Sequence, residues 1–151
     1  MLPQVHIAVS VSVSIIIYGL FQSAWAACSN LLVGVILDLD HVLEYYRTRG
    51  FTLNPLNVYR FCGFAAPKEW PRQIFFWLHA YEYFLVLVVV TCVVNYHPAA
   101  VGALVGMGHH LVLDQMGNNV GPFSYFLTYR LINRFRCDRI LTEKRPWDRR
   151  R

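Results

Sequence analysis

The residues best suited to chemistry lie in one short apolar stretch that contains His109, His110 and Asp114. An ionisable group within a segment of membrane length costs so much free energy that it usually has a function. His110 and Asp114 are four residues apart, so on a helix they share one face with Gly102 and Gly106. An imidazole nitrogen and a carboxylate oxygen on one face can bind a metal ion, and the glycines allow another helix to come close.

Two other segments carry a histidine and a carboxylate at helical spacing. Asp38 and His41 are three residues apart, as are His79 and Glu82, so each pair falls on one face of a helix. Asp40 points elsewhere and can join only where the helix ends or turns. The predicted metal ligands are Asp38, Asp40, His41, His79, Glu82, His110 and Asp114. This nitrogen and oxygen set fits one or two divalent ions, zinc foremost, with Mn2+ and Fe2+ as alternatives.

Several of these groups have an alternative role. A single intramembrane histidine more often bonds to a neighbouring helix than to a metal, and a single aspartate often pairs with arginine. The predicted spans hold no Lys or Arg to neutralise Glu82 and Asp114, so a metal ion or a proton must do so.

Glu82 or Asp40 is the predicted general base. His109 is either a catalytic donor to substrate or a packed neighbour, and His6 is either an extra ligand or a partner of a ligand.

Composition places this chemistry in a membrane. Of the 151 residues, 56% are hydrophobic and 15% are charged, and the mean hydropathy is +0.35, which leaves too few polar residues to cover a soluble globule. The net charge of +5 does not indicate nucleic acid, because the 14 Lys and Arg residues lie only within residues 47–72 and 130–151. Basic loops stay in the cytoplasm, so the loop at 47–73 and the C-terminus are predicted to be cytoplasmic.

The apolar segments predict an all-α, polytopic membrane protein with about four transmembrane helices. Residues 5–37 are too long for one straight span, so we expect a hairpin of helices near 4–22 and 27–46. The alternative is one long tilted helix. Two further spans are predicted at 74–96 and 99–116, joined by a turn.

The C-terminal part differs from these spans. Residues 123–136 predict a basic, amphipathic helix in the membrane surface, and residues 123–151 as a whole are expected to contact anionic lipid. The predicted domains are therefore a membrane-embedded helical metal-site domain at 1–122 and a basic amphipathic helix with a cytoplasmic tail at 123–151.

The predicted topology brings the ionisable groups to one depth. His79 and Glu82 lie two to three turns into the third span from the cytoplasmic side, and His110 and Asp114 lie at a similar depth near the end of the fourth. The acidic cluster that begins at Asp38 ends the second arm on the same side. We therefore expect one polar centre at the cytoplasmic leaflet.

Three short motifs resemble those of a known family. They are Leu-Asp-Leu-Asp-His at 37–41, His-Ala-Tyr-Glu at 79–82 and Gly-His-His-Leu-Val-Leu-Asp at 108–114. In this order they are similar to motifs of the YdjM-like membrane-bound metal-dependent hydrolases of bacteria and archaea. Leu37 stands where that family has proline, His109 stands where it has serine, and the second histidine of the middle motif is absent.

The resemblance covers roughly residues 5–116 and implies a metal-dependent hydrolase, with a fold distantly related to zinc-dependent phospholipase C. The positions that match the family's metal motifs are Asp38, Asp40, His41, His79, His110 and Asp114. Glu82 is the nearest substitute for the missing histidine.

The predicted function is hydrolysis of a phospholipid or lipid-linked phosphoester at the cytoplasmic leaflet, in the bacterial inner membrane or an equivalent membrane, by metal-activated water. Membrane lipid is the expected partner, and a homo-oligomer is compatible with the sequence. The alternative is a non-catalytic membrane subunit in which His79 and His110 bind haem, or in which the polar residues fix helix packing. A di-iron oxygenase would need repeated His-x-x-His-His boxes, which the six histidines of this sequence do not form. Ion transport through the carboxylates is a further alternative.

Overall fold

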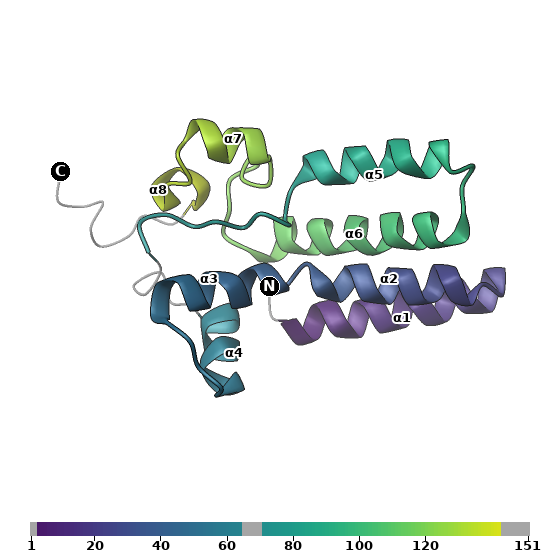
Figure 1. Cartoon of the computed structure of the whole chain (residues 1–151), viewed down its shortest axis with the longest axis horizontal. Coiled ribbons are helices and arrows are strands. Elements are labelled where there is room, and N and C mark those ends of the chain that lie inside the picture. The colour runs from purple at the N-terminus through teal and green to yellow at the C-terminus, as the bar shows by residue number, and fades with distance from the viewer. Residues whose placement is uncertain (1–2, 65–70, 143–151) are drawn as a thin grey trace.

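A computed structural model describes residues 3–64 and 71–142 of the chain. Within these residues the regular structure is helical, apart from two isolated β-bridges, and this confirms the predicted all-α class. The elements in order are α1 (Pro3–Phe21), α2 (Ala24–Ile36), α3 (Leu39–Arg49), α4 (Pro55–Phe64), α5 (Tyr81–Val93), α6 (Pro98–Gly117), α7 (Leu127–Ile132) and α8 (Cys137–Ile140). Figure 1 shows α1, α2, α5 and α6 side by side, with the smaller helices at one end of this bundle.

Helices α1 and α2 form the predicted hairpin, so the alternative of one long helix is wrong. Helix α1 ends at Phe21, Gln22 adopts a positive φ of 50°, and the Ser23 side chain caps α2 by accepting the Ala26 N–H. The chain reverses here because Gln22 lies in the left-handed region and Ser23 caps the next helix.

Helices α2 and α6 approach closely through the predicted glycine face. A side chain at Gly102 would collide with the backbone of Ala26, and one at Gly106 would collide with the backbone of Asn30. Because glycine lacks a Cβ, the two backbones can meet at these points, and His110 and Asp114 on the same face of α6 are carried against α2. This contact fixes the position of both side chains.

The third predicted span is shorter than expected. Helix α5 begins only at Tyr81, whereas the predicted span began at residue 74; residues 71–80 contain no helix. The backbone groups of this extended segment find partners outside a helix: Ile74 N–H donates to Phe135 O (3.0 Å), and Cys137 N–H donates to Arg72 O (3.0 Å). The return helix α6 agrees with the predicted span at 99–116.

The C-terminal region does not form the predicted single helix at 123–136. Helix α7 ends at Ile132, and Arg134 and Phe135 adopt positive φ values of 52° and 55°, which break the helical path. The chain then turns back to pair with the extended segment, where Gln73 and Arg136 form a β-bridge. Residues 65–70 of the predicted basic loop, and the tail from residue 143, lie outside the described residues.

Two helices are long and apolar enough to cross a membrane: Pro3–Phe21, and Ala24–Arg49, which takes in α2 and α3. Helix α5 is apolar but shorter, at 13 residues. This supports the membrane class in part, while the four predicted transmembrane helices go beyond these two.

Candidate metal centre

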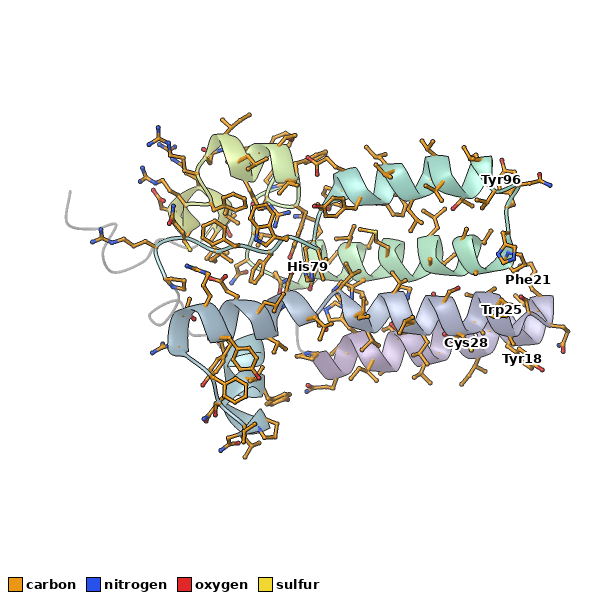
Figure 2. The ribbon with its side chains drawn as sticks, in the orientation of Figure 1. Tyr18, Phe21, Trp25, Cys28, His79 and Tyr96 are labelled. Carbon is orange, nitrogen blue, oxygen red and sulfur yellow. The ribbon has the colours of Figure 1, made fainter. Side chains whose placement is uncertain are left out.

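Four potential metal ligands converge where three parts of the chain meet. His79 ends the extended segment just before α5 (Figure 2), His110 and Asp114 share one face of α6, and Asp38 lies in the turn between α2 and α3. His79, His110 and Asp114 are at most 1% exposed. The predicted convergence of these segments is therefore present in the structure.

The distances between the ligand atoms match a tetrahedral metal site. His79 Nε2 lies 3.1 Å from His110 Nε2 and 3.2 Å from Asp114 Oδ2. His110 Nε2 lies 3.6 Å from Asp114 Oδ2 and 3.7 Å from Asp38 Oδ1. Zinc bonds of 2.0–2.1 Å to nitrogen and oxygen give a tetrahedron with edges of about 3.3–3.4 Å. The three edges that join His79, His110 and Asp114 thus have the spacing that a single ion needs, and Asp38 lies beside them.

Both histidines have a fixed tautomer. His110 Nδ1 lies 2.7 Å from Gly34 O, and His79 Nδ1 lies 3.1 Å from Asp40 Oδ2. A carbonyl or carboxylate oxygen can only accept, so both Nδ1 atoms donate, and in the neutral rings the Nε2 lone pairs face each other. A cation, either a metal ion or a proton, must separate them. Donation from the second ring nitrogen is the usual support for a metal-binding histidine.

Asp114 is also held in orientation from behind. Its Oδ1 accepts from His6 Nε2 at 3.0 Å and from Asn118 Nδ2 at 2.9 Å, while Oδ2 faces the two histidines. The His6 ring stacks on His110 with a centroid distance of 3.9 Å. His6, His110 and Asp114 also bring ligand atoms within 4.8 Å, as do Asp38, His79 and His110. His6, whose role the sequence left open, belongs to the centre; Asn118 was missed, although it follows Asp114 by four residues.

Asp40 supports His79 and lies outside both groups of converging ligand atoms found among the described residues, in contrast to its predicted roles as ligand or base. Its Oδ2 accepts from the backbone N–H groups of Leu78 and His79 as well as from His79 Nδ1. The turn at Asp38 allows this, because it places Asp40 in the first turn of α3, beside the extended segment.

Replacing Asp40 with asparagine is expected to lower metal affinity 10–100-fold, as is typical when a residue that orients a ligand is changed. The measurement is competition for Zn2+ with a chromophoric chelator, and Asp138→Asn is the matched control because Asp138 pairs with Arg136. Unchanged affinity in the Asp40 variant would contradict this role.

His41 lies at the edge of the centre. Its Nδ1 is 3.7 Å from Asp38 Oδ1, beyond hydrogen-bond distance, and its ring stacks on Phe76. It belongs to neither group of converging ligand atoms found among the described residues. Asp38 is the most exposed of the four ligand candidates, with 17% of its side chain accessible, so the open side of the centre is at Asp38.

Glu82 faces away from the centre, which corrects its predicted role as ligand or general base. Its carboxylate accepts the backbone N–H groups of Leu127 (2.8 Å) and Thr128 (2.9 Å) and the Thr128 hydroxyl (2.8 Å). The i,i+3 argument assumed that His79 and Glu82 share a helix, but α5 begins after His79. Glu82 instead caps the N-terminus of α7.

Replacing Glu82 with glutamine is expected to lower the free energy of unfolding by about 0.5–2 kcal/mol, the usual effect of losing a helix cap. Denaturation in detergent measures this effect. The bound metal per chain should stay at the wild-type value; a parallel loss of metal would restore Glu82 as a ligand.

Arg130 is a further member of the site that the sequence did not reveal. It was assigned to a basic surface helix, yet it is 1% exposed and its guanidinium donates to His79 O (2.7 Å) and to Phe76 O. Burial lowers the pKa of the Arg130 guanidinium, and the carboxylates of Asp40 and Glu82 oppose this shift. Arg130 from one side and Asp40 from the other thus clamp the segment that carries His79.

His109, the predicted donor to substrate, lies beside Gly34 and outside both groups of converging ligand atoms.

No family model, curated protein or solved structure matches the chain. The resemblance to the YdjM-like hydrolases therefore rests on the three sequence motifs alone. What the geometry itself establishes is a set of buried His and Asp groups that could hold a metal ion.

Proposed function

We propose that this protein is an integral membrane hydrolase whose metal ion is held by His79, His110 and Asp114, with the fourth coordination position open to water beside Asp38. One observation carries the proposal: the ligand atoms of His79, His110 and Asp114 lie 3.1–3.6 Å from one another. A direct hydrogen bond between the two Nε2 atoms would require a proton on one of them, whereas a metal ion would use both lone pairs and the Asp114 carboxylate.

A single Zn2+ ion fits the donor set best. Two imidazole nitrogens and one carboxylate oxygen at tetrahedral spacing are typical ligands of a zinc ion whose fourth position is left to water. The two groups of converging atoms share His110, so they describe one centre and not two separate sites. Asp40, Gly34 and His6 each support one ligand from behind, as a metal centre requires.

The surface of the bundle supports a membrane setting with four crossing helices. Large aliphatic side chains are exposed on α1, α2, α5 and α6, including Ile15 (68%), Leu32 (61%), Val89 (62%) and Val112 (55%). An apolar surface on every side of a bundle is what lipid contact requires. The basic blocks at 47–72 and 130–151 favour a cytoplasmic location for the end that carries the metal centre, in a bacterial inner membrane or its equivalent.

The substrate proposed is a phospholipid or a lipid-linked phosphoester. A bound divalent metal would lower the pKa of water and polarise a phosphoryl oxygen. Asp38, at the open side, is the carboxylate placed to accept a proton from the attacking water. A centre at the cytoplasmic end of the bundle lies at the depth of lipid headgroups, and nearby basic residues attract anionic lipid.

The haem-binding alternative fits less well. Haem iron ligated by two histidines lies between their nitrogens, with the porphyrin ring separating the two side chains. His79 Nε2 and His110 Nε2 are 3.1 Å apart, which leaves no room for that ring. The alternative of a non-catalytic protein held together by this polar cluster is one outcome of the following test.

The test is elemental analysis of the full chain purified in lipid nanodiscs and supplied with Zn2+, followed by mass spectrometry of products from vesicles of phosphatidylglycerol or phosphatidic acid. We expect one zinc per chain in the wild type, none in His110→Ala, and a wild-type value in His97→Ala, since His97 is exposed and caps the other end of α6. Wild type without transition metal would overturn the metal centre. Metal without hydrolysis would favour the non-catalytic protein.

A further inference from the structure

A second group of buried polar atoms lies beside the metal centre, between α1, α2 and α6. Ser10 and Asn30 are fully buried there, and His109 is partly exposed but buries both ring nitrogens. Four polar atoms in this group have no hydrogen-bond partner within the described protein: Ser10 Oγ, Asn30 Oδ1, and His109 Nδ1 and Nε2. We call Ser10, Asn30 and His109 the inner polar group.

Two members of the inner polar group, Ser10 and His109, lie against Gly34. A methyl group at Gly34 would collide with Ser10 Oγ and would lie 3.0 Å from His109 Cε1 and 3.2 Å from His109 Nε2. The carbonyl of the same glycine accepts the Nδ1 hydrogen of His110. One residue of α2 therefore joins the inner polar group to a ligand of the metal centre.

The orientation of Asn30 is fixed by its amide nitrogen. Nδ2 donates to Ser10 O at 3.1 Å and to Ser14 Oγ at 2.8 Å, and Ser14 Oγ donates to Ala27 O at 2.9 Å. These bonds use the amide donors, so Asn30 Oδ1 must accept from something else. On the same face of α1, one turn from Ser10, His6 also has a buried Nδ1 without a partner.

Leaving these atoms unpaired would be costly. An unsatisfied buried polar group costs about 1–3 kcal/mol, and a helix bundle in lipid offers no bulk water to relieve it. The group combines an acceptor on Asn30, a Ser10 hydroxyl that can both donate and accept, and one donor and one acceptor on a neutral His109. Water, which donates twice and accepts twice, complements all of them; a cation would meet two donors here.

We propose that the inner polar group holds ordered water molecules, and that this water is the reserve from which the buried metal centre is supplied. The supply role rests on the proposed hydrolase function, because each hydrolysis consumes one water molecule. The hydrated site itself does not depend on that function. Buried water of this kind typically makes two to four hydrogen bonds to groups that otherwise lack partners.

The experiment is X-ray radiolytic labelling of the full chain in nanodiscs, read by mass spectrometry. Radiolysis of bound water produces hydroxyl radicals beside it, so His109 is expected to be labelled at a rate comparable to that of the exposed His97. In Ser10→Ala the labelling of His109 should fall at least threefold. Ser12→Ala is the matched control, because the Ser12 hydroxyl is exposed and bonds to Ala8 O of its own helix.

A second variant, Gly34→Ala, places a methyl group against Ser10 Oγ and the His109 ring, so the labelling of His109 is expected to fall here as well. Its control is Gly19→Ala, where an added methyl group meets nothing within 4 Å. Unlabelled His109 in the wild type, or equal labelling in wild type and Ser10→Ala, would overturn the proposal. Labelling needs neither metal nor substrate. If the protein is hydrated here but binds no metal, the hydrolase proposal is wrong and the water site is still supported.

Discussion

Asp114→Asn is expected to reduce the Zn2+ affinity of the centre more than 100-fold, beyond the 10–100-fold range typical of residues that only support a ligand. The asparagine keeps the shape of the side chain but removes the negative charge that faces His79 and His110 across 3.2 Å and 3.6 Å. In a buried site this charge offsets that of the metal ion.

Competition with a chelator of known affinity measures the loss, and circular dichroism checks that the helices persist. Glu82→Gln serves as the control, because it also replaces a carboxylate with an amide but leaves the centre intact. Wild-type affinity in Asp114→Asn would show that the converging ligand atoms are a hydrogen-bonded cluster and not a metal site.

Arg130→Met is expected to lower the free energy of unfolding by about 3–5 kcal/mol, the sum of two lost charge-assisted hydrogen bonds and of the carbonyls left unpaired. The guanidinium is the partner of Phe76 O and His79 O, so its loss also frees the segment that holds His79. We therefore expect metal affinity to fall as well.

Denaturation in detergent measures the stability change, and Arg139→Met is the control because Arg139 is exposed on α8. If both variants unfold at the same denaturant concentration as the wild type, Arg130 is not a clamp. Loss of stability without loss of metal affinity would show that Arg130 stabilises the C-terminal region but does not position the metal ligands.

The parts of the site that lie on one helix could be predicted from the sequence. The four-residue spacing of Gly102, Gly106, His110 and Asp114 directly defines a face, and that face is the one that meets α2. The hairpin was also predicted, because an uncharged segment longer than the membrane favours a turn over one long tilted helix. In both cases the relevant information is local in the sequence.

The parts that depend on distant partners could not be predicted. The apolar residues before Tyr81 read as a helix, but their backbone conformation is set by Asp40 and Arg130, which are 38 or more residues away. Arg130 looked like a surface charge for the same reason. His6 reaches Asp114 across 108 residues, and no local spacing rule detects such a contact.

The two tight connections, Gln22–Ser23 and residues 94–97, lie at the end of the bundle opposite His79, where Tyr18, Phe21, Trp25 and Tyr96 gather (Figure 2). Exposed loop tips remote from the functional groups are the places where proteins best accept inserted domains. A rigid fusion partner grafted at either tip would add the mass that electron cryomicroscopy needs for so small a particle and would leave the end that carries the candidate metal centre unchanged.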